Sequence, residues 1–233
     1  MILNASLKRY FKGFVYPVEI IMFAVYKKCR FGLSYRDIEE LFAMRGLHID
    51  HATLARWVIR FVGILEMQFR KRKKQVHHSW RMDETYIKIK GRWYYLYRAV
   101  DKYGATVEFL LRENRDKKAA KAFFRKAMKD NGNPSVVNID KSGSNTYALE
   151  DINKERGGNN QIKIRQNKYL NNIIEQDHRP SKKAMYVALG FKSFEGAKAT
   201  LSGVEVVRMI KKNQLSCFET QQTSYQKFCS LLA

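Results

Sequence analysis

The sequence predicts a mixed α/β (α+β) chain in which a small all-α region precedes a larger domain built on a mixed sheet. Three observations predict this fold class. Apolar residues recur at helical spacing over residues 17–66, they alternate over residues 79–112, and short apolar strands then alternate with amphipathic helices. These changes of period place a helical domain with a basic linker at 1–76, the sheet domain at 77–213 and a divergent, flexible tail at 214–233.

Besides a helix over about residues 17–28, two short helices are predicted in the first domain, over residues 34–46 and 50–61. Ser34 and Asp50 belong to the residue types that commonly cap a helix N-terminus. A tight turn between two such helices suits a helix-turn-helix, whose second helix enters the major groove of DNA. A plain helical hairpin is the alternative. The polar side of the second helix carries the predicted DNA contacts, which are Thr53, Arg56 and Arg60.

The sheet domain begins with a predicted antiparallel meander. Residues 86–90 alternate, residues 93–100 are rich in aromatics, and residues 106–111 form a third strand after a turn that begins at Asp101. The aromatic side chains of 93–97 could stack on bases, although a tyrosine-rich face of the sheet is the favoured alternative. The elements predicted after the meander are a helix at 116–130, a strand at 136–139, a helix at 145–155, a strand at 161–165, and helices that start near Leu170 and at Phe194.

Charge indicates the class of partner. The chain of 233 residues holds 44 Lys and Arg against 22 Asp and Glu, a formal net charge of +22. A surface so basic repels itself unless a polyanion screens it, so nucleic acid is the leading partner and an anionic membrane surface the weaker alternative. The helical domain is the more densely basic of the two, and it closes with the run Arg70–Lys74.

Cysteines and apolar runs exclude several other classes of protein. Cys29, Cys217 and Cys229 are far apart and form no CxxC pair, so we expect neither a zinc finger nor a disulfide framework, and a reduced cytoplasm fits. The early apolar run at 20–26 is too short to span a bilayer, and no small-residue cleavage site follows it. A membrane protein and a secreted leader are therefore not expected.

Three acids lie on separate predicted elements where they could converge. Asp83 lies in the first strand, Asp140 directly follows the apolar strand 136–139, and Glu175 lies on a later helix. Carboxylates suit Mg²⁺, and two such ions clamp the attacking and leaving oxygens of a phosphoryl transfer. Ordinary surface acids are the alternative. The neighbouring acids Glu84 and Asp177 are weaker candidates, because Glu84 points to the opposite face of the strand from Asp83 and Asp177 lies on a different side of the helix from Glu175.

The helix around Glu175 also carries cations. His178 and Arg179 follow three and four residues later, and Lys182 follows seven residues later, so all share one helical face. These side chains could hold DNA phosphates. Pro180 should end or kink the helix, and His178 could instead be a structural histidine.

Long blocks of the chain resemble the DDE-type transposases of bacterial insertion sequences, specifically the insertion-sequence six group. The resemblance covers about residues 12 to 213, and the tail beyond Asn213 has no counterpart. The matching blocks, in the order of that group, are FKG (11–13) with PVEII (17–21), LSYRDIEEL (33–41), DHATLARWV (50–58), WRMDETYIKIKG (80–91), WYYLYRAVD (93–101), KYLNNIIEQDHR (168–179) and LGFKSF (189–194).

The resemblance implies an RNase H-like catalytic domain and a Mg²⁺-dependent transposase with two ions, for which Mn²⁺ can substitute. It places the catalytic and metal-binding triad at Asp83, Asp140 and Glu175, and the group's basic residue seven positions later at Lys182. It further implies binding of terminal inverted repeats, cleavage at 3′ ends, strand transfer into target DNA and formation of cointegrates.

The same mechanism implies a homodimer or larger synaptic assembly, located in the bacterial cytoplasm at the nucleoid. Two other functions stay open: an inactive transposase that acts as a DNA-binding repressor, and a structure-specific RNase H-like nuclease.

Overall fold

The computed structural model describes residues 8–140, 143–167, 172–216 and 222–232. Packing divides the chain into two compact units, one of residues 75–182 and one of residues 1–74 with 183–233. The mixed α/β class is confirmed, because one unit is built on a sheet and the other is helical. None of the helices in the described ranges is long and apolar enough to cross a membrane.

The sheet unit contains five strands in the order β3-β2-β1-β4-β5. β1 to β3 form the predicted antiparallel meander, and the shorter β4 and β5 are parallel to β1. The sheet is mixed, as predicted from the sequence. The strands are β1 (Ser79–Ile89), β2 (Arg92–Asp101), β3 (Thr106–Arg112), β4 (Val136–Ile139) and β5 (Lys163–Gln166).

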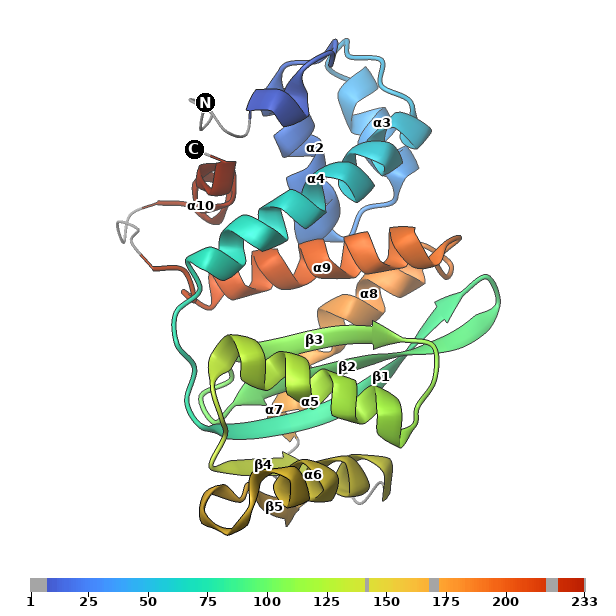
Figure 1. The fold of residues 1–233 in the computed structure, drawn as a ribbon. Helices are drawn as coiled ribbons and strands as arrows, with labels where there is room; N and C mark the ends of the chain where they lie inside the picture. The colour runs from blue at the N-terminus through green and yellow to red at the C-terminus, as the bar shows by residue number, and fades with distance from the viewer. Residues whose placement is uncertain (1–7, 141–142, 168–171, 217–221, 233) are drawn as a thin grey trace. The chain divides into compact units, whose positions relative to one another are not determined.

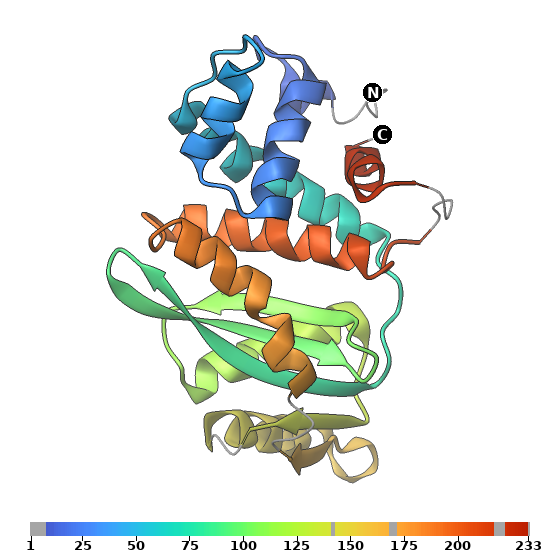
Figure 2. The ribbon, with the colours of Figure 1, turned by 180° about the vertical axis from the view of Figure 1, so that it is seen from behind.

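Helices cover both faces of this sheet. On one face lie α5 (Lys117–Asn131) and α6 (Gly143–Arg156), as Figure 1 shows. Trp80, Met82 and Tyr97 point to that face and form a core with the inner sides of the two helices. The short α7 (Asn172–Asp177) contacts β1 and β2 from the opposite face (Figure 2). Alternation along β1 therefore sends neighbouring side chains into two different layers.

The helical unit is built around α9 (Phe194–Lys211), which packs along α2 (Val18–Phe31) and α4 (His51–Lys71). The two predicted N-caps are confirmed. Ser34 starts α3 (Tyr35–Ala43) with a capping box, and Asp50 accepts backbone hydrogen bonds at the start of α4. α4 continues ten residues beyond the predicted end at Phe61 because its apolar stripe does, with Val62, Leu65 and Phe69 all buried.

The end of the chain differs from the predicted flexible tail. Residues 217–221 and 233 lie outside the described residues, but α10 (Ser224–Cys229) and the 3₁₀ turn Ser230–Leu232 are packed. Phe228, Leu231 and Leu232 are fully buried, and the Arg72 guanidinium donates hydrogen bonds to the carbonyl oxygens of Ser230 and Leu231. Burial of these three apolar side chains and the two hydrogen bonds from Arg72 together stabilise the segment.

Packing also assigns α9 to the helical unit, whereas the sequence pattern placed residues 183–213 with the sheet. The division between the units falls inside α8 (Arg179–Val187). The packed units therefore differ from the predicted domains, which were 1–76, 77–213 and 214–233.

Gly203 on α9 allows the close approach of α2 and α4. A Cβ atom there would clash with Sγ of Cys29 and lie 3.2 Å from Cγ2 of Val62. We expect Gly203→Ala to lower the free energy of unfolding by about 1–3 kcal/mol, the usual cost of overpacking a core. Gly63→Ala is the matched control. It lies in α4 with open space around it, so alanine there should stabilise by about 0.5–1 kcal/mol. Urea unfolding of both variants measures the contrast, and equal effects would contradict it.

Candidate active site

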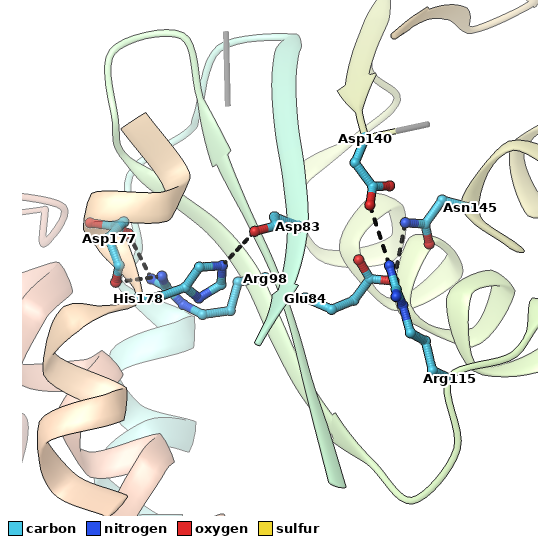
Figure 3. Close-up of polar contacts among 8 residues, drawn as sticks. All are labelled: Asp83, Glu84, Arg98, Arg115, Asp140, Asn145, Asp177 and His178. Carbon is cyan, nitrogen blue, oxygen red and sulfur yellow. Dashed lines mark hydrogen bonds and ion pairs between the residues drawn. The ribbon is translucent and has the colours of Figure 1, made fainter. Parts of the chain in front are cut away.

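The register of two parallel strands brings Asp83 and Asp140 together. Arg81 of β1 pairs with Asn138 of β4, so Asp83 and Asp140 follow two residues later at the edge where β4 ends. Carboxylate oxygens of Asp83, Glu84 and Asp140 all lie within 4.8 Å of one another (Figure 3). The carboxyl edge of a strand in an α/β sheet is where ligands commonly bind.

Glu84 belongs to this cluster although it points to the opposite face from Asp83 (Figure 3). Its side chain is 3% exposed, and its Oε1 accepts a hydrogen bond from Nδ2 of Asn145 at 3.1 Å. The Arg115 guanidinium bridges the cluster, with Nε 3.3 Å from Glu84 and Nη2 3.3 Å from Asp140. Burial raises the pKa of the Glu84 carboxyl, and the charges of Asp140 and Asp83 raise it further, whereas Arg115 lowers it.

A polar cavity of about 580 Å³ connects the first acid with the third. Asp83 and Glu84 line it from β1, and Glu175 lines it from α7. Glu175 is exposed, whereas Asp83 and Asp140 are half-buried. The remaining lining residues are Thr85, Asn172, Gln176, His178, Arg179 and Lys182.

The helix predicted around Glu175 is broken, and the break preserves the predicted grouping. α7 ends at Asp177, and α8 starts at Arg179 with Pro180 in its first turn, where a missing N–H has no cost. Glu175, Arg179 and Lys182 still line one cavity, and the last two are exposed.

His178 occupies a different place from the DNA contact that the sequence predicted. It is 2% exposed, and its Nε2 lies 3.3 Å from Oδ2 of Asp83. A side chain so deeply buried holds a carboxylate of the site rather than a phosphate at the surface. The alternative reading of a structural histidine describes it better.

A buried ion pair ties α7 to the sheet. Arg98 lies directly opposite Asp83 on β2 and is completely buried. Its Nη2 donates to Oδ2 of Asp177 at 2.7 Å, and its Nη1 donates to the Asp177 carbonyl oxygen, also at 2.7 Å (Figure 3). Asp177 follows Glu175 by two residues on α7. The ion pair therefore ties the helix that carries Glu175 to β2, which pairs with the strand that carries Asp83.

The predicted contacts of the helix-turn-helix lie at the start of α4. Thr53 donates a hydrogen bond to the Asp50 carboxylate, and Nη2 of Arg56 donates to Oγ1 of Thr53 at 2.6 Å. Arg56 is exposed. Arg60 is engaged differently, since its Nη2 donates to the Tyr10 carbonyl oxygen and its guanidinium lies 4.9 Å from the ring centre of Phe14.

Sequence reasoning missed several members of the site or ranked them low: Glu84, Arg98, Arg115, Asn145 and Asp177. Of these residues, Arg98 could have been found from the sequence. A two-residue turn at Lys90 and Gly91, both with positive φ, sets a register that places Asp83 opposite Arg98.

Known proteins similar to this chain are transposases. Residues 77–214 match the family model for the DDE domain of IS240 transposases, and residues 13–140 match that of the IS66 transposase family. The transposase for insertion sequence element IS257 in transposon Tn4003 of Staphylococcus aureus is 40% identical over 215 residues, which cover 89% of this chain and 91% of that protein. The transposase for the insertion sequence-like element IS431mec of S. aureus strain Mu50 has the same identity and coverage.

Among solved structures, the catalytic core domain of HTLV-2 integrase in complex with magnesium is 17% identical. The match has a TM-score of 0.47 and covers 67% of this chain and 99% of that one. The family match over more than half of the chain, and the relatives aligned over most of its length, confirm the resemblance found in the sequence. The chain belongs to the DDE transposases of bacterial insertion sequences, which are polynucleotidyl transferases.

Proposed function

We propose that this transposase binds the terminal inverted repeats of its own insertion sequence and joins its 3′ ends to target DNA, forming cointegrates. The observation that carries the proposal is the pairing of Asp83 with Asp140 at one sheet edge, beside a cavity that Glu175 also lines. Asp83 and Asp140 have carboxylate oxygens within 4.8 Å of each other, and Glu175 lines the same cavity as Asp83.

The donor set of this edge fits divalent metal ions. Every candidate ligand is a carboxylate oxygen, the donor that Mg²⁺ prefers, and Mn²⁺ accepts the same ligands. Oε2 of Glu84 is buried and has no hydrogen-bond partner within the described ranges, as expected for an oxygen that faces a cation site. Asp83, Asp140 and Glu175 are the residues that would hold two ions. Such ions would supply Lewis-acid stabilisation of the attacking and leaving oxygens.

The other residues of the site orient the acids and meet the DNA. His178 lies against Asp83 with its Nε2 3.3 Å from Oδ2, and Arg115 offsets the mutual repulsion of Glu84 and Asp140. Arg179 and Lys182 line the cavity with exposed cations suited to phosphate oxygens. In this arrangement water first cuts the strand at the element end, and the freed 3′-OH then attacks a phosphodiester of the target.

Recognition of the ends is assigned to the helix-turn-helix of α3 and α4. Its capped second helix presents Thr53 and Arg56 near its N-terminus, where a recognition helix contacts base edges. Arg60 lies one turn further and also anchors the N-terminal segment. Because two ends must be brought together before strand transfer, we propose that the working form is a homodimer or larger assembly.

A strand-transfer assay tests this function. The full-length protein is incubated with DNA that carries the element's own ends, a supercoiled target and Mg²⁺ or Mn²⁺. We expect joined products with either metal, and none with EDTA or with scrambled ends. Cutting without joining would support the nuclease instead, and binding of the ends without cutting would support the repressor.

A further inference from the structure

The β1–β2 hairpin continues beyond the rest of the sheet as a two-stranded ribbon. β4 pairs with β1 only as far as Arg81, and β3 pairs with β2 only between Tyr95 and Val100, so residues 87–94 have no third strand (Figure 1). Side chains alternate along it. Ile87 and Ile89 are 0% and 2% exposed, whereas Tyr86 is 50% exposed. One face of the ribbon is therefore buried and the other is open.

The open face carries two exposed aromatic rings, those of Tyr86 and Trp93. Trp93 is 52% exposed, and its ring centre lies 6.1 Å from that of Tyr86 at an interplanar angle of 82°. The ring of Tyr95, which is half-buried, lies 5.2 Å from that of Tyr86. Nζ of Lys88 lies 5.8 Å from the ring centre of Trp93. The sequence favoured a tyrosine-rich sheet face here, and that holds for Tyr97 in the core but not for Trp93.

The charge of this ribbon matches that of a polyanion. No acidic residue occurs between Glu84 and Asp101, and the cations Lys88, Lys90 and Arg92 are exposed at or near the turn. The open face also leads away from the acids, because Glu84, Tyr86 and Lys88 alternate onto the same side of β1. Successive residues on one side of a strand are about 7 Å apart, so Tyr86 follows Glu84 of the acid cluster at about that distance along β1.

We propose that this surface, made of Tyr86, Lys88, Trp93 and the turn residue Lys90 and called the hairpin surface below, binds an unpaired stretch of DNA next to the strand that is cut. Exposed rings stack on the faces of unpaired bases, which a duplex does not offer, and the neighbouring cations contact phosphates. The proposal deepens the proposed function and rests on it, because the DNA that reaches the hairpin surface is the DNA held at the acids.

The test measures DNA binding without metal, so that it does not require catalysis. Fluorescence anisotropy compares full-length wild type and the Tyr86→Ala/Trp93→Ala variant on end DNA with a single-stranded overhang and on blunt duplex. Stacking contributes about 1–3 kcal/mol per base, so the variant should lose affinity for the overhang DNA about fivefold to 100-fold, with a change of less than about twofold for blunt DNA. The Trp93→Phe variant keeps an aromatic face and should therefore retain most of the wild-type difference between overhang and blunt DNA.

Tyr103→Ala is the matched control. Tyr103 is 77% exposed, lies in the other turn of the meander and has Nζ of Lys102 at 4.8 Å from its ring centre. We expect it to bind both DNAs as wild type does. Lys88→Gln, a change at an exposed cation on the face of Trp93, should reduce the salt dependence of overhang binding without altering the fold.

Three outcomes would overturn the proposal. Wild type could bind overhang and blunt DNA equally, or Tyr103→Ala could lose as much affinity for overhang DNA as Tyr86→Ala/Trp93→Ala does. The third is that the Tyr86→Ala/Trp93→Ala variant is a monomer whereas wild type is a dimer. The last result would make the hairpin surface a contact between protein copies. Failure of strand transfer with an intact overhang preference would instead contradict the proposed function alone.

Discussion

Asp140→Asn is expected to reduce strand transfer by about a thousandfold or more while leaving binding of the element ends within about twofold of wild type. Asparagine keeps the size of the side chain but removes the charge from an acid whose oxygens lie within 4.8 Å of those of Asp83 and Glu84. Metal-assisted stabilisation of the transition state is worth several kcal/mol, and each 1.4 kcal/mol changes the rate tenfold. End binding is assigned to the helix-turn-helix and therefore should not depend on this charge.

Asp151→Asn provides the control for a general loss of negative charge. Asp151 lies on α6 of the same unit and pairs with Lys117 and Lys121 at the surface. It should retain full strand transfer. Substantial strand transfer by Asp140→Asn would show that the acid cluster is not the catalytic centre. Parallel loss of end binding would mean that the substitution had disturbed the fold, which circular dichroism would detect.

The acids at the sheet edge show how much of the site can be predicted from local sequence patterns. Asp140 follows an apolar strand, so its place at a carboxyl edge could be predicted from the sequence, and so could the opposite orientations of Asp83 and Glu84. The sequence did not reveal that β4 pairs with β1 only as far as Arg81. Beyond that point the edge is open, and the longer Glu84 side chain reaches the other two carboxylates from the far face. Strand pairing is a property of tertiary structure, which no local period encodes.

His178 and Pro180 mark a second limit. Helical spacing predicted one face for Glu175, His178 and Arg179, and the cavity lining has this composition even though the helix breaks at His178. The spacing could not show that His178 turns inward, because its neighbour Asp83 lies on β1, far away in the sequence. Nor could it reveal the role of Asp177, whose partner Arg98 is 79 residues away.

The Arg98–Asp177 ion pair is the second place where a single substitution should have a large effect. Arg98 is completely buried, and the Asp177 side chain is only 12% exposed. Removing one partner of a buried pair is strongly destabilising because the other charge stays in a low-dielectric site. We expect Asp177→Ala to lower the free energy of unfolding by about 3 kcal/mol, measured by urea unfolding of the full chain. Arg125→Met, which breaks the exposed pair with Glu155, should have little or no effect.

A double substitution separates the stabilising role of this pair from its positioning role. Replacing both charges with apolar residues of similar volume, as in Arg98→Met/Asp177→Leu, commonly restores stability because no buried charge remains. The helix of Glu175 would then lack its fastening to β2, and a displacement of about 1 Å at a catalytic group can cost about a hundredfold in rate. We therefore expect the double variant to recover stability but not strand transfer. Recovery of both would show that the pair stabilises the fold without positioning Glu175.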